Sequence, residues 1–109
     1  MITTKFTEMF GIEKPIVQGG MQNIAWPKFA ALISNAGGMG TINVTCWDSA
    51  AAFEEGVKEM KDLTDKPFIV NFSLVPDLTK GPEIMKYIEI CGKHRVAAIE
   101  FAGADPSEF

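Results

Sequence analysis

Short apolar runs alternate with longer segments of helical periodicity along the chain. Four runs rich in aliphatic and aromatic residues, bounded by glycine, proline or charge, predict β-strands at residues 16–20, 39–44, 68–72 and 96–101. None of these runs alternates cleanly between polar and apolar residues, which favours strands covered on both faces, as in a parallel sheet. Parallel strands are joined by crossovers, so we expect a helix in each interval.

Each of the three intervals carries helix start and stop signals. Apolar residues recur there at spacings of three and four, which gives each segment one apolar stripe. Early proline, a capping side chain, glycine after the last turn and basic residues near the end are typical of helix boundaries. The signals are Pro27 and Gly37-Gly38 for the first helix, Asp48 or Ser49 and Pro67 for the second, and Pro82 and Lys93-His94-Arg95 for the third.

The order of elements indicates an α/β fold with repeated right-handed βαβ units. Successive predicted strands begin roughly 25 residues apart, the size of such units. No linker, low-complexity stretch or second domain interrupts residues 1–109. Residues 104–109 resemble a loop and the first turn of a fourth helix, so we expect the chain to stop where that helix begins.

Composition narrows the classes of function. The chain has 109 residues, 47% of them hydrophobic, and a formal charge of −4 without a basic stripe, so nucleic acid is not an expected partner. No secretory signal and no apolar run of about 18 residues is present, which predicts a cytoplasmic protein without a membrane partner. Cys46 and Cys91 are far apart and lack metal-ligand spacing, so free thiols and no metal site are expected.

Candidate chemistry lies just after the strands, because ligands of parallel α/β sheets bind at the strands' carboxyl ends. Gly19-Gly20 would let the backbone approach a flat ligand, and Met21 could place a thioether against an aromatic ring. Asn71 offers donors and an acceptor that suit the edge of a flavin or a base. The alternatives are a glycine turn with a core methionine, and an asparagine that turns the chain.

Three other features favour structural roles. The glycines of residues 36–40 follow a helix and lack the GxGxxG pattern, so we assign them to helix termination. His94 lies in a basic helix end, without a serine, cysteine or carboxylate pattern around it in the sequence, and is expected to interact with the helix dipole. Glu100 occupies the ligand-binding end by position, where an exposed or polar-network role is favoured over general-base catalysis.

Three segments, taken in order, carry a family resemblance. Residues 4–21, which end in PIVQGGM, resemble the opening of the nitronate monooxygenases, formerly 2-nitropropane dioxygenases. SNAGGMG at 34–40 is similar to that family's segment before strand two, and LTDKPFIVN at 63–71 to its third strand. Together the segments are specific for this family and its relative, the flavin-dependent enoyl-acyl-carrier-protein reductase.

The resemblance implies the N-terminal half of a TIM (β/α)8 barrel, with about four parallel strands and three helices over residues 1–109, truncated before strand five. It also implies non-covalent FMN and oxidation of alkyl nitronates by O2 to a carbonyl compound and nitrite. By the same resemblance Gly20, Met21 and Gln22 lie against the flavin and Asn71 hydrogen-bonds it. Many members carry proline before the methionine, whereas here Gly20 precedes Met21, which indicates a subgroup.

The resemblance also implies that part of the active site lies outside residues 1–109. The family's catalytic histidine and phosphate-binding loops lie in the second half of the barrel, so no catalytic residue is expected here and the chain by itself should be inactive. The apolar residue types around Trp47 and Phe72 suggest a hydrophobic substrate pocket. Two alternatives remain open: enoyl-thioester reduction with a nicotinamide donor, and a half-barrel that serves as a binding or assembly module and self-associates.

Overall fold

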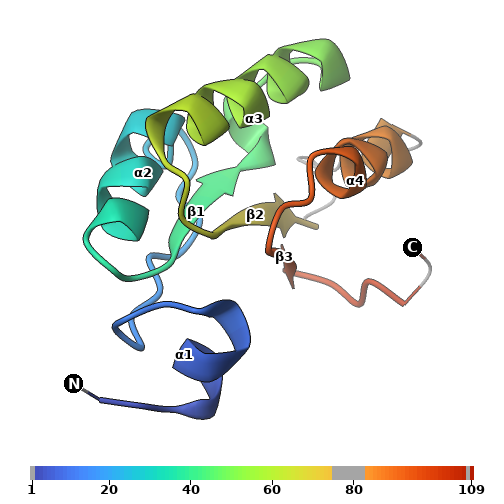
Figure 1. Ribbon diagram of the computed structural model, residues 1–109. Helices are drawn as coiled ribbons and strands as arrows, with labels where there is room; N and C mark the ends of the chain where they lie inside the picture. Colours follow the sequence, from blue (N-terminus) through green and yellow to red (C-terminus); the bar gives the residue numbers. More distant parts are fainter. Residues whose placement is uncertain (1, 75–82, 108) are drawn as a thin grey trace.

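A parallel three-stranded sheet organises the structure, a computed structural model that describes residues 2–74, 83–107 and 109. The strands are β1 (Gly40–Asn43), β2 (Phe68–Ser73) and β3 (Ala98–Ala102), and β2 lies between the other two (Figure 1). Both pairings are parallel, as the absence of clean alternation predicted. The sheet and its crossovers confirm the α/β class and cover part of a barrel.

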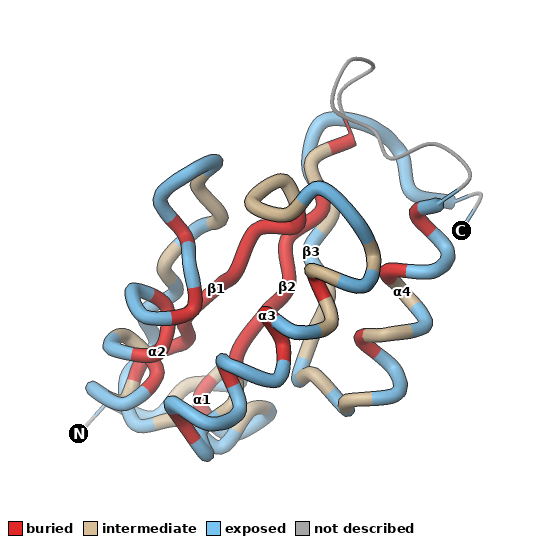
Figure 2. The backbone as a smooth tube through the Cα atoms, turned by 90° about the horizontal axis from the view of Figure 1, so that it is seen from above, coloured by how far each residue is buried: buried red, intermediate tan, exposed pale blue. Residues whose placement is uncertain are grey.

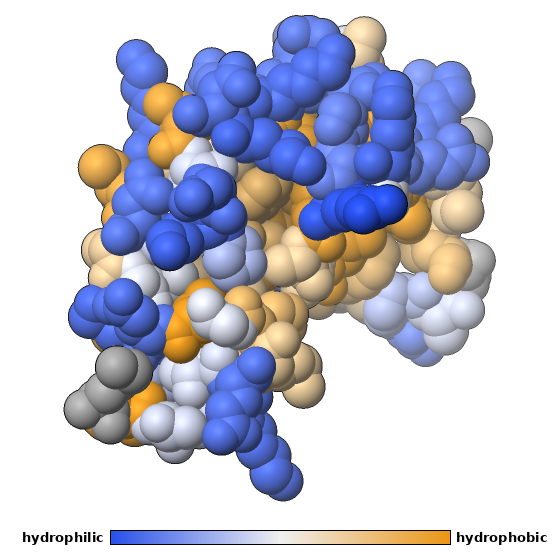
Figure 3. Space-filling view, in the orientation of Figure 1, coloured by the Kyte–Doolittle hydropathy of each residue, from blue (hydrophilic) through white to orange (hydrophobic). Residues whose placement is uncertain are grey.

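Three crossover helices lie on one face of this sheet, with a short helix near the N-terminus. The helices are α1 (Lys5–Phe10), α2 (Pro27–Asn35), α3 (Ala50–Leu63) and α4 (Ile84–Lys93), and a 3-10 turn, η1 (Val44–Cys46), follows β1. Figures 1 and 2 show α2, α3 and α4 over the same side of the strands. In the orientation of Figure 1, hydrophilic residues cover the outer side of α3 at the top of Figure 3.

The predicted boundary signals act as expected. The Ser49 hydroxyl accepts a hydrogen bond from the Ala52 amide at 3.1 Å and caps α3. After α2, Gly37 has φ of +100° and the Gly38 amide donates to the Ile33 carbonyl, which ends the helix as predicted. The predicted start of the third crossover helix at Pro82 lies outside the described residues.

The first predicted strand, residues 16–20, is wrong as a strand. Only an isolated parallel bridge between Val17 and Met39 forms there, with the Gln18 amide donating to the Met39 carbonyl at 3.0 Å. At Thr41 of β1 the partner is the Gln18 side chain instead of the backbone. Its Oε1 accepts from the Thr41 amide and its Nε2 donates to the Thr41 carbonyl, both at 3.0 Å. The Gln18 side-chain amide thus takes the hydrogen bonds that a paired strand would make with Thr41, and residues 19 and 20 are not part of the sheet.

Helix α1 was not predicted. Thr4 and Thr7 form a reciprocal capping box, and Gly11 ends the helix with φ of +67°. The described residues thus contain three strands and four α-helices where about four strands and three helices were expected. The bridge segment occupies the place of the missing strand, so the chain path still follows the barrel order.

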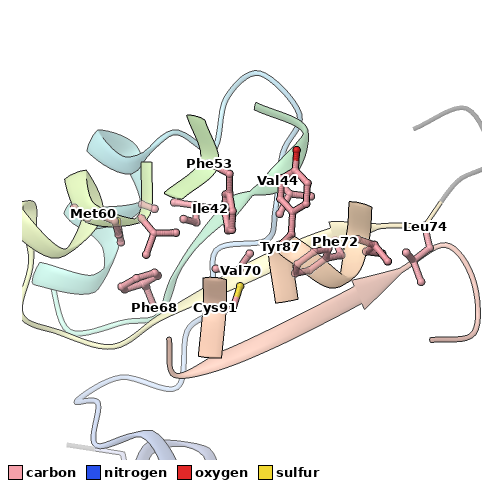
Figure 4. Close-up of a cluster of buried hydrophobic side chains, with 14 residues drawn as sticks. Ile42, Val44, Phe53, Met60, Phe68, Val70, Phe72, Leu74, Tyr87 and Cys91 are labelled. Carbon is pink, nitrogen blue, oxygen red and sulfur yellow. The ribbon is translucent and has the colours of Figure 1, made fainter. Parts of the chain in front are cut away.

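Alternate residues of β2 divide the sheet into two faces. Phe68, Val70 and Phe72 belong to the buried apolar cluster between the sheet and the helices (Figure 4). Ile69, Asn71 and Ser73 therefore point to the opposite face, because successive side chains of a strand alternate. In a closed barrel that face is the interior. The cluster consists of Ala30, Ala31, Ile42, Val44, Phe53, Val57, Met60, Phe68, Val70, Phe72, Leu74, Ile84, Tyr87 and Cys91.

Candidate functional site

One residue from each strand forms a continuous line across the interior face. The parallel register pairs Asn43 of β1 with Asn71 of β2, and Asn71 with Glu100 of β3. We call Asn43, Asn71 and Glu100 the polar row. Asn43 and Asn71 are almost completely buried, whereas Glu100 is exposed. Asn43 is the last residue of β1 and Asn71 lies in the carboxyl half of β2, near the end of the sheet where parallel α/β folds bind ligands, whereas Glu100 is the central residue of β3.

Hydrogen bonds join the members of the polar row. Asn43 Nδ2 donates to Asn71 Oδ1 at 2.9 Å, and Asn71 Nδ2 donates to Glu100 Oε2 at 3.1 Å. The Ser73 hydroxyl also donates to Asn71 Oδ1, at 3.3 Å. At the other end, Asn43 Oδ1 accepts from the Thr45 amide at 2.9 Å and the Thr45 hydroxyl at 2.6 Å. The polar-network role favoured for Glu100 agrees with this arrangement.

The glycine loop lies directly against the centre of the polar row. A Cβ added at Gly20 would be 2.6 Å from the Asn71 Cβ and Cγ atoms and 2.7 Å from its Oδ1. Only glycine therefore allows the loop to approach Asn71 this closely. Met21 follows, half-buried, and its carbonyl accepts from the Ile24 and Ala25 amides, which turns the chain toward α2. Gln22 is exposed.

The four predicted binding residues differ in how close they lie to the polar row. Gly20 and Asn71 are in contact, Met21 is the next residue in the loop, and Gln22 is on the surface of the described chain. Sequence reasoning missed Asn43, because it looked for candidates just after the strands, and Asn43 lies within the second predicted strand, residues 39–44. The available signal was a lone amide within that run, since a buried asparagine needs partners for both ends of its side chain.

The two residues of the suggested hydrophobic pocket lie apart: Trp47 lines a hollow of about 200 Å³ beside α2 and α3, and Phe72 does not line it. Phe72 is 1% exposed and belongs to the helix-facing cluster, where its ring stacks on Phe101 at 5.3 Å. Trp47 packs on Gly56 of α3 and against Trp26 at 5.5 Å, which places it beside the helices. Strand alternation explains the error at Phe72, which is one residue from Asn71 and therefore faces the other way.

Other reactive groups lie apart from the polar row. Burial raises the pKa of the Cys46 thiol and raises that of Cys91 to about 12, so both are neutral thiols at physiological pH. His94 has a carboxylate neighbour that sequence spacing did not reveal: its Nε2 is 2.9 Å from Glu54 Oε1, which also accepts from Lys93 at 2.6 Å. These two partners lower the pKa of Glu54 to about 2.

Two further properties concern the described residues as a set. No group of three metal-ligating side chains among residues 2–74, 83–107 and 109 could hold a metal ion. In the same part of the chain, no helix has the length and apolarity to cross a membrane.

A hollow of about 520 Å³ touches Phe68 and Ala97 at the amino ends of β2 and β3, the opposite end of the sheet from the polar row.

The parallel βαβ arrangement, with the polar row across its interior face, is that of a partial TIM-barrel enzyme. Structure comparison agrees: FabK from Thermotoga maritima, a TIM barrel, aligns over 100% of this chain and 33% of that chain, with a TM-score of 0.87 and 30% identity. The sequence model for nitronate monooxygenase matches residues 3–106. The chain belongs to the nitronate monooxygenase family, a family of oxidoreductases.

Curated relatives agree on this family. A nitronate monooxygenase of Pseudomonas aeruginosa is 44% identical over 73 residues, which cover 64% of this chain and 20% of that protein. A (3aS,4S,5R,7aS)-5-hydroxy-7a-methyl-1-oxo-octahydro-1H-indene-4-carboxyl-CoA dehydrogenase of Rhodococcus jostii is 39% identical over 107 residues, 98% of this chain and 29% of that protein. The chain thus spans about a fifth to a third of the length of these relatives.

Proposed function

We propose that the chain forms one wall of an FMN site in a nitronate monooxygenase, an enzyme that oxidises alkyl nitronates with O2 to a carbonyl compound and nitrite. The observation that carries the proposal is the contact between Gly20 and a buried Asn71 whose amide is held by the polar row. Both residues belong to segments that resemble the family. Family membership supplies the flavin chemistry as the expected class of reaction.

The residues at this end of the sheet suit a flavin. Asn71 has an amide nitrogen with one acceptor among the described residues, Glu100, so a second N–H is available to a ligand carbonyl or ring nitrogen. A Cβ at Gly19 would meet no described atom within 4 Å, so the loop offers open backbone to a flat ring. On the same face, the Thr41 hydroxyl is buried without a partner in the described part of the chain.

In the complete barrel, residues 1–109 would bind the flavin ring, and the other half would supply the remaining contacts. Gly20, Met21, Gln22 and Asn71 would hold and orient the ring of FMN, and the flavin would supply the redox chemistry. We assign neither a catalytic base nor the phosphate contacts to residues 1–109, because the resemblance places both in the second half of the barrel. We place the enzyme in the cytoplasm, with a nitronate and O2 as its small-molecule partners.

The test uses a complete barrel, which we define as this chain joined to, or co-expressed with, the remaining strands and helices. We expect stoichiometric FMN after gel filtration, and O2 uptake with nitrite release on addition of an alkyl nitronate. The chain on its own should be colourless, because it lacks the charge-assisted phosphate contacts. A complete barrel that binds FMN but releases no nitrite would contradict the proposed reaction.

A second candidate is dehydrogenation of a coenzyme A thioester. The Rhodococcus jostii dehydrogenase aligns with nearly the whole chain, whereas the Pseudomonas aeruginosa nitronate monooxygenase aligns with about two thirds of it. Supplying the flavin barrel anaerobically with a nitronate or with a cyclic acyl-CoA substrate separates the two. Flavin bleaching by the thioester alone would favour the dehydrogenase.

A further inference from the structure

The polar row determines which end of the Asn71 amide is available to a ligand. We propose that Asn43 and Glu100 are positioning residues that fix the Asn71 side chain with its N–H group free, so that the site selects a ligand atom that accepts a hydrogen bond. The inference deepens the proposed function and rests on it where the ligand is FMN. The orientation itself rests only on contacts within the chain.

The backbone amide of Thr45 determines how the side-chain amides of the polar row are oriented, because a backbone N–H can only donate a hydrogen bond. The backbone amide of Thr45 donates to an Asn43 side-chain atom at 2.9 Å, so that atom must be the oxygen. The other end of the Asn43 amide is then the nitrogen, which faces Asn71 at 2.9 Å. A nitrogen donor requires the Asn71 oxygen opposite it. The Asn71 nitrogen is thereby directed at Glu100, whose carboxylate accepts.

The hydrogen-bonding capacity of Asn71 is then used asymmetrically. Its oxygen has two lone pairs, and these are taken by Asn43 Nδ2 and the Ser73 hydroxyl. Its nitrogen has two hydrogens, of which Glu100 Oε2 takes one within the described residues. Asn71 thus presents a donor to a ligand and no acceptor. A flavin carbonyl or an unprotonated ring nitrogen fits this donor, whereas a ring N–H in the same place does not.

Burial makes this orientation costly to reverse. Asn43 is 2% exposed and Asn71 is 4% exposed, so a rotated amide would set nitrogen against nitrogen at Asn43 without water to relieve that contact, and would set its oxygen against the Glu100 carboxylate. The exposed Glu100 supplies the terminal charge, and a hydrogen bond to a charged acceptor is stronger than a neutral one. The orientation of the Asn71 amide is therefore fixed by Asn43 on one side and by Glu100 on the other.

The decisive experiment inverts the polar row without removing it. In Asn43→Asp combined with Glu100→Gln, an acceptor stands at position 43 and a donor becomes available at 100, so the Asn71 amide turns over and every member keeps a partner. The net charge is unchanged. Because the new carboxylate at position 43 is buried, we expect the variant to melt at a lower temperature than the wild type. In the folded complete barrel it should bind FMN about ten- to a hundredfold more weakly, because the free acceptor of Asn71 now faces an acceptor. Wild-type FMN affinity in a folded inverted variant would overturn the proposal.

Single substitutions separate positioning from bulk structure. Glu100→Ala should weaken FMN binding by about three- to thirtyfold, and Glu100→Gln should recover most of that loss, because its carbonyl oxygen still accepts from Asn71. Glu89→Ala, which removes an exposed carboxylate from α4, is the matched control and should leave affinity unchanged. Equal affinity for Glu100→Ala and the control would refute the role of Glu100.

A flavin-independent measurement keeps this inference distinct from the proposed function. The side-chain amide protons of Asn71 should give two widely separated, slowly exchanging NMR signals, which converge in Glu100→Ala and stay apart in Glu100→Gln. If the wild-type barrel bound no FMN, the proposed function would fail, while these signals would still decide the orientation. Asn71 signals that are the same in Glu100→Ala and wild type would overturn the positioning role.

Discussion

Adding one methyl group at Gly20 should disrupt the polar row from within. In Gly20→Ala the new Cβ would lie 2.6 Å from two Asn71 carbons and 2.7 Å from its Oδ1. Contacts of this kind normally measure about 3.5–4.0 Å, so the Asn71 side chain or the loop must move by about 1 Å. The Asn71 oxygen would then lose good geometry to Asn43 at 2.9 Å and Ser73 at 3.3 Å.

The expected cost follows from these two bonds. Each buried hydrogen bond contributes about 1 kcal/mol, and a buried amide left unsatisfied costs up to about 3 kcal/mol, so the free energy of unfolding should fall by about 2–4 kcal/mol. Urea unfolding followed by tryptophan fluorescence measures this change. Gly19→Ala is the control, because no described atom lies within 4 Å of its added Cβ; it should be neutral or stabilising by up to about 1 kcal/mol. Equal stability of the two variants would refute the packing argument at Gly20.

Four further outcomes are expected. Thr41→Val should raise the free energy of unfolding by about 1–2 kcal/mol, because it removes a buried hydroxyl that has no partner in the described residues; a loss in urea midpoint would contradict this. Lys93 and His94 lower the Glu54 pKa from 4.5 to about 2, so this carboxylate stabilises the fold above pH 4.5 and the effect is lost as pH falls toward about 2. Glu54→Gln should therefore flatten the pH dependence of the urea midpoint in that window, and an unchanged slope would argue against the ion cluster. Because burial raises the Cys91 pKa to about 12, Ellman's reagent at pH 8 should label this thiol only after unfolding, and rapid labelling of native protein would disprove its burial. The open edge of β3 should cause self-association, so light scattering is expected to give a mass above 11.9 kDa, whereas a cooperatively melting monomer would show that the edge is tolerated.

Local signals predicted most of the fold. Pro27, Ser49 and Gly37 act at helix ends through their own backbone or side-chain chemistry, which needs no knowledge of distant residues. The short helix α1 escaped prediction because its capping box uses two threonines rather than the usual acidic partner. The first strand was overestimated because Gln18 substitutes a side-chain amide for backbone pairing, and no local pattern reveals that replacement.

The candidate site was predicted only in part, for a geometric reason. Position after a strand identified Gly20 and Asn71, and the structure brings them into contact. The partnership of Asn43, Asn71 and Glu100 depends on strand register, which relates residues 28 and 29 positions apart in the sequence. The direction of each side chain likewise depends on strand parity, which is why Phe72 was assigned to the wrong face of the sheet.

The polar row also bears on how the chain finds its own strand pairing. A slip of β2 by one residue would turn Asn71 toward the helices and Phe72 toward the interior. That misfolded sheet would bury an amide among apolar side chains and leave Asn43 and Glu100 without their shared partner, at a cost of about 2 kcal/mol or more. Competing registers of a purely apolar β2 would differ far less in free energy. The residues proposed to select the ligand would therefore also favour the native alignment of the strands over a register shifted by one residue.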